Sequence, residues 1–410
     1  MNLLKLTCPG CGCLCDDIQV EVEGNGIKRI ESACAKGASL LYASQNLERR
    51  NLCQIHGQGV PLERAIEEAA YLLKRSKRRL IFGLDNSTLE AQAVGIELAR
   101  TLGAVLDDSS SFCQGCLIEN IFKGTIPSCS LSEVKDKADL LIYWGSNPSH
   151  SHPRHLSEFS YYACTEYDEI SCLPKVKLAC IDVRETEVSS LSTFFKLKPG
   201  GDRDFIEAAL ATLKNEGESK QAKTFAELVK NSRFCAIFAG LGLTYALDGD
   251  YHLFAEMVQE FSRSTQMAVI PMVGHFNMRG FNQSLYTKTG YINRVSFADG
   301  VSHREEYSFL EQIRNRLADC VLIIGSDPFS NLPYSLMNKL YGLPIICLDP
   351  FLTSTTRITH LVFGTALSGL ECGGKAIRMD GEEVMLPKVK ASDYPSDEEI
   401  LKRLLGEVRL

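Results

Sequence analysis

The sequence lacks a long apolar run and has no excess of basic residues, with 44 Lys and Arg against 51 Asp and Glu. Hydrophobic residues make up 45% and charged residues 23% of the 410 positions, which is ordinary for a globular protein. No apolar run is long enough to span a bilayer, and Met1 to Thr7 are too few and too polar for a signal peptide. The net charge is −7 with both signs scattered, so no basic surface is available for nucleic acid. We expect a cytoplasmic protein that has no membrane span and does not bind nucleic acid.

Cysteine, in contrast, is abundant, with 16 residues. Disulfides are not expected in a reducing compartment, so this number indicates metal binding together with some buried thiols. Cys8, Cys11, Cys15 and Cys34 follow the spacing C-x2-C-x3-C-x18-C, and four thiolates on short turns can hold an iron–sulfur cubane. A zinc ribbon would need a second C-x2-C some tens of residues further along, and none lies there. Cys13 is expected not to bind metal, and cysteines that merely fill a core are the alternative.

The rest of the chain alternates between helical and strand patterns. Alternating apolar residues around Asn25-Gly26 predict a short hairpin. Apolar residues at helical spacing then predict a helix that begins after Pro61 and ends near Leu73. A buried strand is expected over 79–83, and Asn86-Ser87 is expected to cap the next helix. This alternation is typical of doubly wound parallel sheets.

These patterns predict an α/β protein with three parts. A small N-terminal iron–sulfur-type domain is expected over 1–55. Two doubly wound, Rossmann-like α/β domains are expected to follow, one formed by 56–135 with 350–410 and the other by 136–349. No run of strands that would form a C-terminal β-barrel follows.

Two stretches of the chain repeat one another. Residues 138–148 and 318–328 each form an apolar strand that ends in Gly-Ser-(Asn/Asp)-Pro, and a later strand in each half ends in aspartate. Glycine at the end of a parallel strand lets a diphosphate approach the backbone, and the aspartate can accept hydrogen bonds from guanine or ribose. We expect two dinucleotide-like ligands, with strand-ending turns of no further role as the alternative. The residues expected to bind them are Gly145, Ser146, Asn147, Pro148, Asp182, Arg184, Gly325, Ser326, Asp327 and Asp349.

A second thiol site follows the strand that ends at Asp107. Cys113 would lie at the end of a parallel strand, where its thiolate could bind molybdenum or tungsten. A half-buried thiol and a redox pair with Cys116 are equally open alternatives. Further on, the histidines of 150–155 have a spacing that can bind zinc. No cysteine or carboxylate lies nearby in the sequence, so contact of Arg154 and His155 with an anion or cofactor is favoured.

Taken together, these motifs resemble the B subunit of formylmethanofuran dehydrogenase, within the molybdopterin oxidoreductase superfamily, over nearly the whole chain. Each motif alone is weak, but their order is specific. The motifs that carry the resemblance are the cysteine motif of 8–34, 90–92, 113–115, 125–127, 143–148, 153–155, 280–283, 289–291, 326–328, 369–374 and 378–380.

The resemblance implies a 4Fe-4S cluster next to a bis-(molybdopterin guanine dinucleotide) centre with tungsten or molybdenum. Cys113 takes the place of the metal ligand, and His275 is the second catalytic residue. In that family this subunit reduces carbon dioxide to formate reversibly, and an amidohydrolase-like sister subunit condenses formate with methanofuran. A separate β-barrel subunit and a ferredoxin-like subunit are the other implied partners, in the one-carbon metabolism of methanogenesis.

This sequence departs from the family pattern at three positions. Gln114 replaces a histidine, Val273 replaces an arginine before the Gly-His pair, and Ser146 replaces a cysteine. Loss of a proton donor and a cation would weaken the stabilisation of a carboxylate or its transition state. The alternative is therefore a non-catalytic scaffold subunit of a bacterial formyltransferase/hydrolase complex. A thiol redox protein that uses Cys113 and Cys116 is a third alternative.

Overall fold

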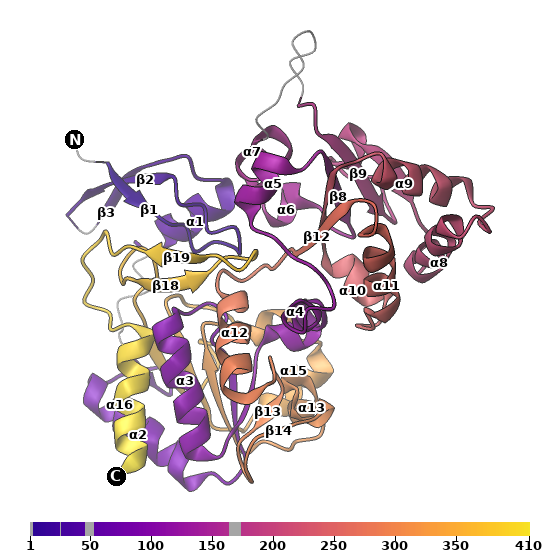
Figure 1. Cartoon of the computed structure of the whole chain (residues 1–410). Helices are drawn as coiled ribbons and strands as arrows, with labels where there is room; N and C mark the ends of the chain where they lie inside the picture. The colour runs from indigo at the N-terminus through magenta and orange to yellow at the C-terminus, as the bar shows by residue number, and fades with distance from the viewer. Residues whose placement is uncertain (1–2, 25, 46–52, 164–173) are drawn as a thin grey trace. The chain divides into compact units, whose positions relative to one another are not determined.

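Contacts within the chain divide it into two units. Figure 1 shows the computed structural model of the chain, coloured by residue number. Unit 1 contains Met1–Ser111, His275–Arg378 and Glu383–Leu410, and unit 2 contains Phe112–Gly274 and Met379–Glu382. The structure describes residues 3–24, 26–45, 53–163 and 174–410. The three-part division expected from the sequence, with a separate segment 1–55, stays a prediction.

Unit 1 begins with a small antiparallel sheet. Its strands are β1 (Leu4–Leu6), β2 (Ile18–Glu23) and β3 (Gly26–Glu31), and β2 pairs with β3 as the predicted hairpin. Asn25 of the expected turn lies outside the described residues. The loop from β1 to β2 carries the first four cysteines of the chain, and helix α1 (Ala35–Ala43) begins directly after Cys34.

The main sheet of unit 1 is mixed. Within the described ranges it has nine strands in the order β14-β13-β7-β6-β15-β16-β17-β4-β5. The five strands from β7 to β17 are parallel, and in chain order they run 2-1-3-4-5, a doubly wound order with a switch point between β6 and β15. The strands are β4 (Cys53–Ile55), β5 (Gln58–Gly59), β6 (Arg79–Gly83), β7 (Val105–Asp107), β13 (Val295–Ser296), β14 (Ser302–His303), β15 (Cys320–Ile324), β16 (Ile345–Asp349) and β17 (Leu361–Gly364).

Helices cover both faces of this sheet. Alternate residues of β6 point to opposite faces, so Ile81 joins the core under α2, α3 and α16, while Leu80 and Phe82 join the core under α13 and α15. Figure 1 shows α2, α3 and α16 side by side over one face. The helices are α2 (Leu62–Arg75), α3 (Leu89–Leu102), α12 (Met278–Thr289), α13 (Phe309–Arg314), α14 (Pro328–Asn331), α15 (Tyr334–Leu340) and α16 (Asp397–Arg409).

The start of α3 differs from the prediction. The hydroxyl of Thr88, not Asn86 or Ser87, accepts the hydrogen bond from the first turn, at 3.3 Å from Ala91 N. The hydroxyl of Ser87 donates instead to the Asp397 carboxylate at 2.6 Å. The hydroxyl of Ser87 is therefore engaged by a residue distant in the sequence, and the cap is Thr88, one residue later.

Unit 2 is built on a parallel sheet of five strands in the order β10-β9-β8-β11-β12. In chain order the strands run 3-2-1-4-5, so the switch point lies between β8 and β11. The strands are β8 (Leu140–Trp144), β9 (Lys177–Asp182), β10 (Thr193–Lys196), β11 (Phe234–Ala239) and β12 (Gln266–Pro271). The helices are α4 (Gly115–Phe122), α5 (Leu131–Lys137), α6 (Pro148–Ser151), α7 (His155–Glu158), α8 (Asp202–Leu213), α9 (Lys220–Lys230), α10 (Leu241–Ala246) and α11 (His252–Phe261).

The core of unit 2 surrounds Trp144 at the end of β8. Its ring is fully buried and lies edge-on to Phe205, Phe225 and Phe254, with ring centroids 5.8, 6.0 and 5.6 Å away. Its Nε1 donates to Asp202 Oδ1 at 2.7 Å, which joins β8 to the first turn of α8. With one mixed and one parallel sheet covered by helices, the predicted α/β class is confirmed. In the part of the chain that the structure describes, no helix combines the length and apolarity that crossing a membrane requires.

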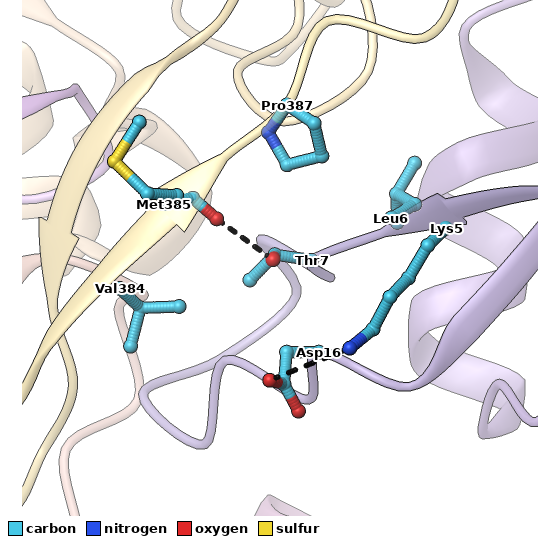
Figure 2. Close-up of a pocket in the computed structure, with 7 residues that line it drawn as sticks. All are labelled: Lys5, Leu6, Thr7, Asp16, Val384, Met385 and Pro387. Carbon is cyan, nitrogen blue, oxygen red and sulfur yellow. Dashed lines mark hydrogen bonds and ion pairs between the residues drawn. The ribbon is translucent and has the colours of Figure 1, made fainter.

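A small hairpin, β18 (Gly374–Ile377) with β19 (Glu383–Leu386), lies beside β1 in unit 1. A cavity of about 330 Å³ separates β19 from β1, and Figure 2 shows its seven lining residues. Thr7 Oγ1 donates to the Met385 carbonyl at 2.8 Å, and Lys5 Nζ lies 4.0 Å from Asp16 Oδ2. The hydrogen bond between Thr7 and Met385 therefore joins the start of the cysteine loop to the hairpin.

Candidate metal and cofactor sites

The loop between β1 and β2 brings its cysteines back upon one another. Cys8 N donates to the Cys15 carbonyl at 2.9 Å, and Leu14 N donates to the Cys11 carbonyl at 3.2 Å. Leu14 has a φ of 44°, in the left-handed region that closes tight turns, and its side chain packs in a small cluster with residues of the β18–β19 hairpin. Cys8, Cys11 and Cys15 are buried. The loop is therefore a closed turn lined by sulfur.

Cys34 meets this loop at Gly37. A Cβ atom on Gly37 would lie 2.8 Å from Cys8 Sγ and 3.8 Å from Cys34 Sγ, and one on Gly10 would lie 3.3 Å from Cys8 Sγ. Gly37 N also donates to Cys34 Sγ at 3.4 Å, where Cys34 caps α1. An alanine at Gly37 would therefore push the Cys8 sulfur out of its present position.

The thiols of this loop have very different proton affinities. Burial raises the pKa of Cys8 to about 12, and the nearby Cys11 and Cys34 add to this effect. A hydrogen bond from the Cys13 thiol lowers the pKa of Cys11 to about 7, while burial raises the pKa of Cys13 well above its usual value. The Cys13 thiol is therefore the donor and the Cys11 sulfur the acceptor of this hydrogen bond. That Cys13 lies outside the set of metal ligands stays a prediction.

The sulfur atoms do not form a ligand shell in the ranges 3–24, 26–45, 53–163 and 174–410. Among these residues, no three or more His, Cys, Asp and Glu side chains are arranged so that they could hold a metal ion. The four cysteines fit an iron–sulfur cluster by donor type and by the space that Gly37 leaves beside them. Their role as ligands stays a prediction.

The repeated turn of unit 2 follows β8. Gly145 has a φ of 58°, and its N–H donates to the Ile181 carbonyl at 2.8 Å. A Cβ atom here would lie 2.4 Å from Leu243 N, so only glycine fits. Asn147 Nδ2 donates to Glu187 Oε2 at 2.9 Å, which orients the amide at the start of α6.

A cavity of about 370 Å³ opens beside this turn in unit 2. Asn147, His150 and Arg184 line it together with residues of 185–190, so the structure places the β8 turn and the segment after β9 at one cavity. Asp182 Oδ1 accepts from Arg184 N at 3.2 Å, which closes the turn after β9. The cavity offers a guanidinium cation, an imidazole and carboxylate acceptors.

Unit 1 repeats this backbone but uses the side chains differently. Gly325 has a φ of 59°, and its N–H donates to the Leu348 carbonyl at 2.8 Å, as in the first copy. Asp327 Oδ1, however, accepts from both Thr355 N at 2.8 Å and Thr355 Oγ1 at 2.6 Å. Asp349 Oδ1 accepts from Phe351 N at 2.8 Å, two residues further on, just as Asp182 accepts from Arg184 N in unit 2. The two copies therefore differ at Asn147 and Asp327, whose partners the sequence repeat did not indicate.

Cys113 lies in unit 2 directly before α4. Cys113 and Cys116 are both partly exposed, and the buried hydroxyl of Tyr251 lies close to both. Burial raises the pKa of that hydroxyl, and the two cysteines add to the rise. Gln114 is fully buried between them, with Nε2 donating to the Ala239 carbonyl and Oε1 accepting from Thr244 Oγ1, both at 3.4 Å. Gln114 therefore holds this loop against β11 and α10.

The histidine cluster does not match its prediction. The His155 ring is fully buried, and its Nδ1 lies 2.8 Å from the Tyr143 hydroxyl. Burial lowers the pKa of His155 well below the usual value, and the nearby His152 adds to this effect. An uncharged, buried ring is not placed to contact an anion. His152 Nε2 bonds to the Val273 carbonyl at 2.8 Å, and Arg154 pairs with Glu158 at 2.8 Å.

His275, in unit 1, has partners that the sequence did not reveal. Its Nδ1 lies 2.8 Å from Asp85 Oδ2 and 2.7 Å from Ser109 Oγ. Burial alone would lower the pKa of His275, but the Asp85 carboxylate outweighs burial and raises it. Asp85 follows β6 without any motif, so the only available signal was its place at the end of a parallel strand.

No model of a known protein family matches the chain. Two relatives match it over their full length, and both are the B subunit of a tungsten-containing formylmethanofuran dehydrogenase 2. The protein from Methanocaldococcus jannaschii is 32% identical over 431 residues, which cover 99% of this chain and 98% of the relative. The protein from Methanococcus maripaludis is 30% identical over 432 residues, which cover 100% of this chain and 99% of the relative.

Two solved structures share the fold at low sequence identity. One is a chain of the formyltransferase/hydrolase complex from Methylorubrum extorquens, solved in complex with methylofuran. It has a TM-score of 0.70 and 19% identity, and the match covers 87% of this chain and 98% of that chain. Acetylene hydratase from Pelobacter acetylenicus has a TM-score of 0.71 and 11% identity, over 99% of this chain and 69% of that chain. At these identities the matches describe the fold alone.

Proposed function

Since the chain belongs to the family of formylmethanofuran dehydrogenase B subunits, we propose that it interconverts carbon dioxide and formate as one subunit of a larger complex. The observation that carries this proposal is the 32% identity, over 99% of the chain, to the B subunit of a tungsten-containing formylmethanofuran dehydrogenase 2. Partners would be an amidohydrolase-like subunit, a β-barrel subunit and a ferredoxin-like subunit, in a cytoplasmic complex of one-carbon metabolism.

Cys8, Cys11, Cys15 and Cys34 would hold a 4Fe-4S cluster, which supplies electron transfer when bound. The closed loop and the glycine at Gly37 support this assignment, because they leave the Cys8 sulfur unobstructed. The Cys13 thiol donates to the Cys11 sulfur, and hydrogen bonds to ligating sulfurs tune the reduction potential of such clusters.

Cys113 would hold tungsten or molybdenum, and two molybdopterin guanine dinucleotides would complete the centre and supply two-electron redox chemistry. The turns at Gly145 and Gly325 would let the diphosphates approach the backbone closely, because glycine has no side chain in the way. Arg184 would add a cation in unit 2, where the cavity is about 370 Å³. The remaining residues proposed to contact the dinucleotides are Ser146, Asn147, Pro148, Asp182, Ser326, Asp327 and Asp349.

His275 is the catalytic group that this chain would contribute in addition to Cys113. Formate oxidation releases one proton, and a titratable residue must exchange it. Gln114 and Val273 are fully buried and carry no such proton. The half-exposed imidazole of His275, with its raised pKa, supports this role.

A scaffold subunit in a formyltransferase/hydrolase complex is the second candidate. The observation that favours it is the buried position of Gln114 and Val273, where the family pattern has a proton donor and a cation. Such a subunit would retain the fold but would not interconvert formate and carbon dioxide.

The test is metal analysis and formate oxidation on the complex prepared without oxygen, comparing Cys113→Ser with Cys116→Ser. Both cysteines are partly exposed in the same segment, so Cys116→Ser is a matched control. We expect Cys113→Ser to abolish formate turnover and remove tungsten or molybdenum while iron stays, and Cys116→Ser to retain all three.

Two outcomes would count against the first function. A fully loaded wild-type complex without tungsten and molybdenum would favour the scaffold. Turnover in Cys113→Ser at the wild-type rate would refute the ligand assignment.

A further inference from the structure

The loop after β6 lies at the switch point of the unit 1 sheet and has an unusual backbone. Gly83 and Leu84 both have positive φ, at 106° and 73°. A Cβ atom on Gly83 would lie 2.1 Å from the Ile324 carbonyl oxygen, and Leu84 N donates to that same oxygen at 2.9 Å. A bulky residue such as leucine rarely adopts this conformation, and such strain is concentrated at functional sites. The loop therefore fixes the position of the backbone at the next residue, Asp85.

Asp85 and Ser109 both bond to one nitrogen of His275. Asp85 is fully buried, and its Oδ2 accepts from Ser109 Oγ and lies 2.8 Å from His275 Nδ1. An ionised carboxylate has no proton to donate, and the Ser109 hydroxyl donates its proton to Asp85. The proton between Asp85 and His275 therefore belongs to Nδ1, and Nε2 is the ring nitrogen left to titrate.

This geometry is not that of a serine nucleophile. In a catalytic triad the serine and the carboxylate bond to opposite nitrogens of the imidazole. Here both bond to Nδ1, and Ser109 is only 5% exposed. Ser109 instead supports the carboxylate of Asp85 and the orientation of the ring.

The charges around His275 act in opposite directions. Lys36 of α1 disfavours a second positive charge on the ring, whereas Asp85 favours it. Behind Asp85 lie the buried carboxyl groups of Asp107 and Asp108, and burial raises the pKa of both. The proximity of Asp85 contributes to the rise at Asp108. Asp85 is thus the ionised member of a buried acidic group, and it faces the imidazole.

We propose that Asp85 is a positioning residue that keeps Nδ1 of His275 protonated, so that proton exchange with the substrate occurs at Nε2 alone. This inference rests on the proposed function for the identity of the substrate, formate or carbon dioxide. Formate oxidation breaks one C–H bond and yields carbon dioxide, two electrons and one proton. Two molecules of an added viologen dye accept one electron each in the assay, and Nε2 accepts the proton.

The direct test measures the exchange of the imidazole C2 hydrogen for deuterium by mass spectrometry, peptide by peptide, over pH 5–9 on the intact complex. In the wild type we expect the pH midpoint of His275 to lie above that of free histidine. In Asp85→Asn the midpoint should fall, because the amide is uncharged and nearly the same size. The exposed Asp299→Asn should leave it unchanged. A wild-type midpoint at or below that of free histidine would overturn the proposal without any variant.

The variant Ser109→Ala distinguishes the effect of the Asp85 carboxylate from a general disturbance of packing in the loop. It removes the hydrogen bonds of Ser109 Oγ to Asp85 and to His275 but keeps the Asp85 carboxylate, so the midpoint of His275 should stay above that of free histidine. A fall as large as in Asp85→Asn would show that the whole loop is disturbed, and would refute the role of the carboxylate.

Activity provides the second readout. Asp85→Asn should lower formate oxidation by viologen on the order of 100-fold, a typical loss for a mispositioned general base, with little change in KM. An unchanged pH profile would contradict the proposal. If the wild-type complex shows no formate turnover, the proposed function fails, while the deuterium exchange still decides whether Asp85 controls His275.

Discussion

At the scale of single residues, the glycines next to the cysteine loop are as informative as the cysteines. The spacing of Cys8, Cys11, Cys15 and Cys34 could be read from the sequence, because short turns with thiols are a known pattern. The close packing of Gly37 on Cys8 could not, since it depends on Cys8 Sγ lying 2.8 Å from the position that a Cβ atom would take. Residues that leave space for a group are visible only in three dimensions.

Gly37→Ala should therefore reduce the iron content of the purified complex severely, because the added methyl group displaces the Cys8 sulfur. Gly10→Ala should reduce it less, since its Cβ would lie 3.3 Å from the same atom. Gly406→Ala is the matched control, because nothing lies within 4 Å of its Cβ position in α16. Iron measurement per chain checks this order, and equal iron in all three variants would count against a cluster at Cys8.

At the scale of elements, the strand repeat was predictable and its side-chain use was not. Apolar strands that end in Gly-Ser-(Asn/Asp)-Pro recur at β8 and β15, and the glycine N–H bonds of both copies have the same length of 2.8 Å. The partners of Asn147 and Asp327 lie in loops far along the chain, at Glu187 and Thr355. Periodicity reveals the backbone of such a repeat, whereas long-range partners decide its chemistry.

The end of β7 gives a pH prediction for unit 1. Asp107 accepts from Phe309 N at 2.7 Å and from Arg294 N at 3.1 Å. Burial nevertheless raises its pKa from 3.8 to about 7. Between these values the folded state holds a proton that the unfolded state has lost, so the free energy of unfolding falls as pH rises. This contribution is at most about 4 kcal/mol.

In Asp107→Asn the free energy of unfolding should depend less on pH between pH 4 and 7, whatever the absolute stability of the variant. Urea denaturation monitored by circular dichroism at a series of pH values measures the slope of the free energy of unfolding against pH. The exposed Asp299→Asn should retain the wild-type slope. A slope unchanged by Asp107→Asn would mean that Asp107 is ionised throughout this range.

At the scale of the whole molecule, the two units have separate cores. One core of unit 1 lies beneath α2, α3 and α16, and that of unit 2 surrounds β8 and β11. The alternation of helices and strands predicted the α/β class, but not that strands β6 and β15, which lie far apart in the sequence, pair in one sheet. Pairing between distant segments leaves little local signal.

The single tryptophan of the sequence, Trp144, lies in the core of unit 2 and so reports on that unit alone. Its fluorescence in urea should follow the unfolding of unit 2, whereas far-ultraviolet circular dichroism follows both units. We expect two transitions with different midpoints, because each unit buries its own apolar residues. Coincident curves would show that the chain unfolds as one cooperative whole.

The discontinuous course of unit 1 also affects how the nascent chain matures on the ribosome. Strands β6 and β7 emerge early, but β15, the parallel neighbour of β6, is translated only after the continuous part of unit 2. The hairpin of β18 and β19, which packs on Leu14 of the cysteine loop, is made later still. The cysteines of this loop therefore leave the exit tunnel before the main strands of unit 1, and the hairpin packs on the loop only after those strands have been made. If this loop holds an iron–sulfur cluster, as proposed, it stays open to assembly factors until the hairpin has been made.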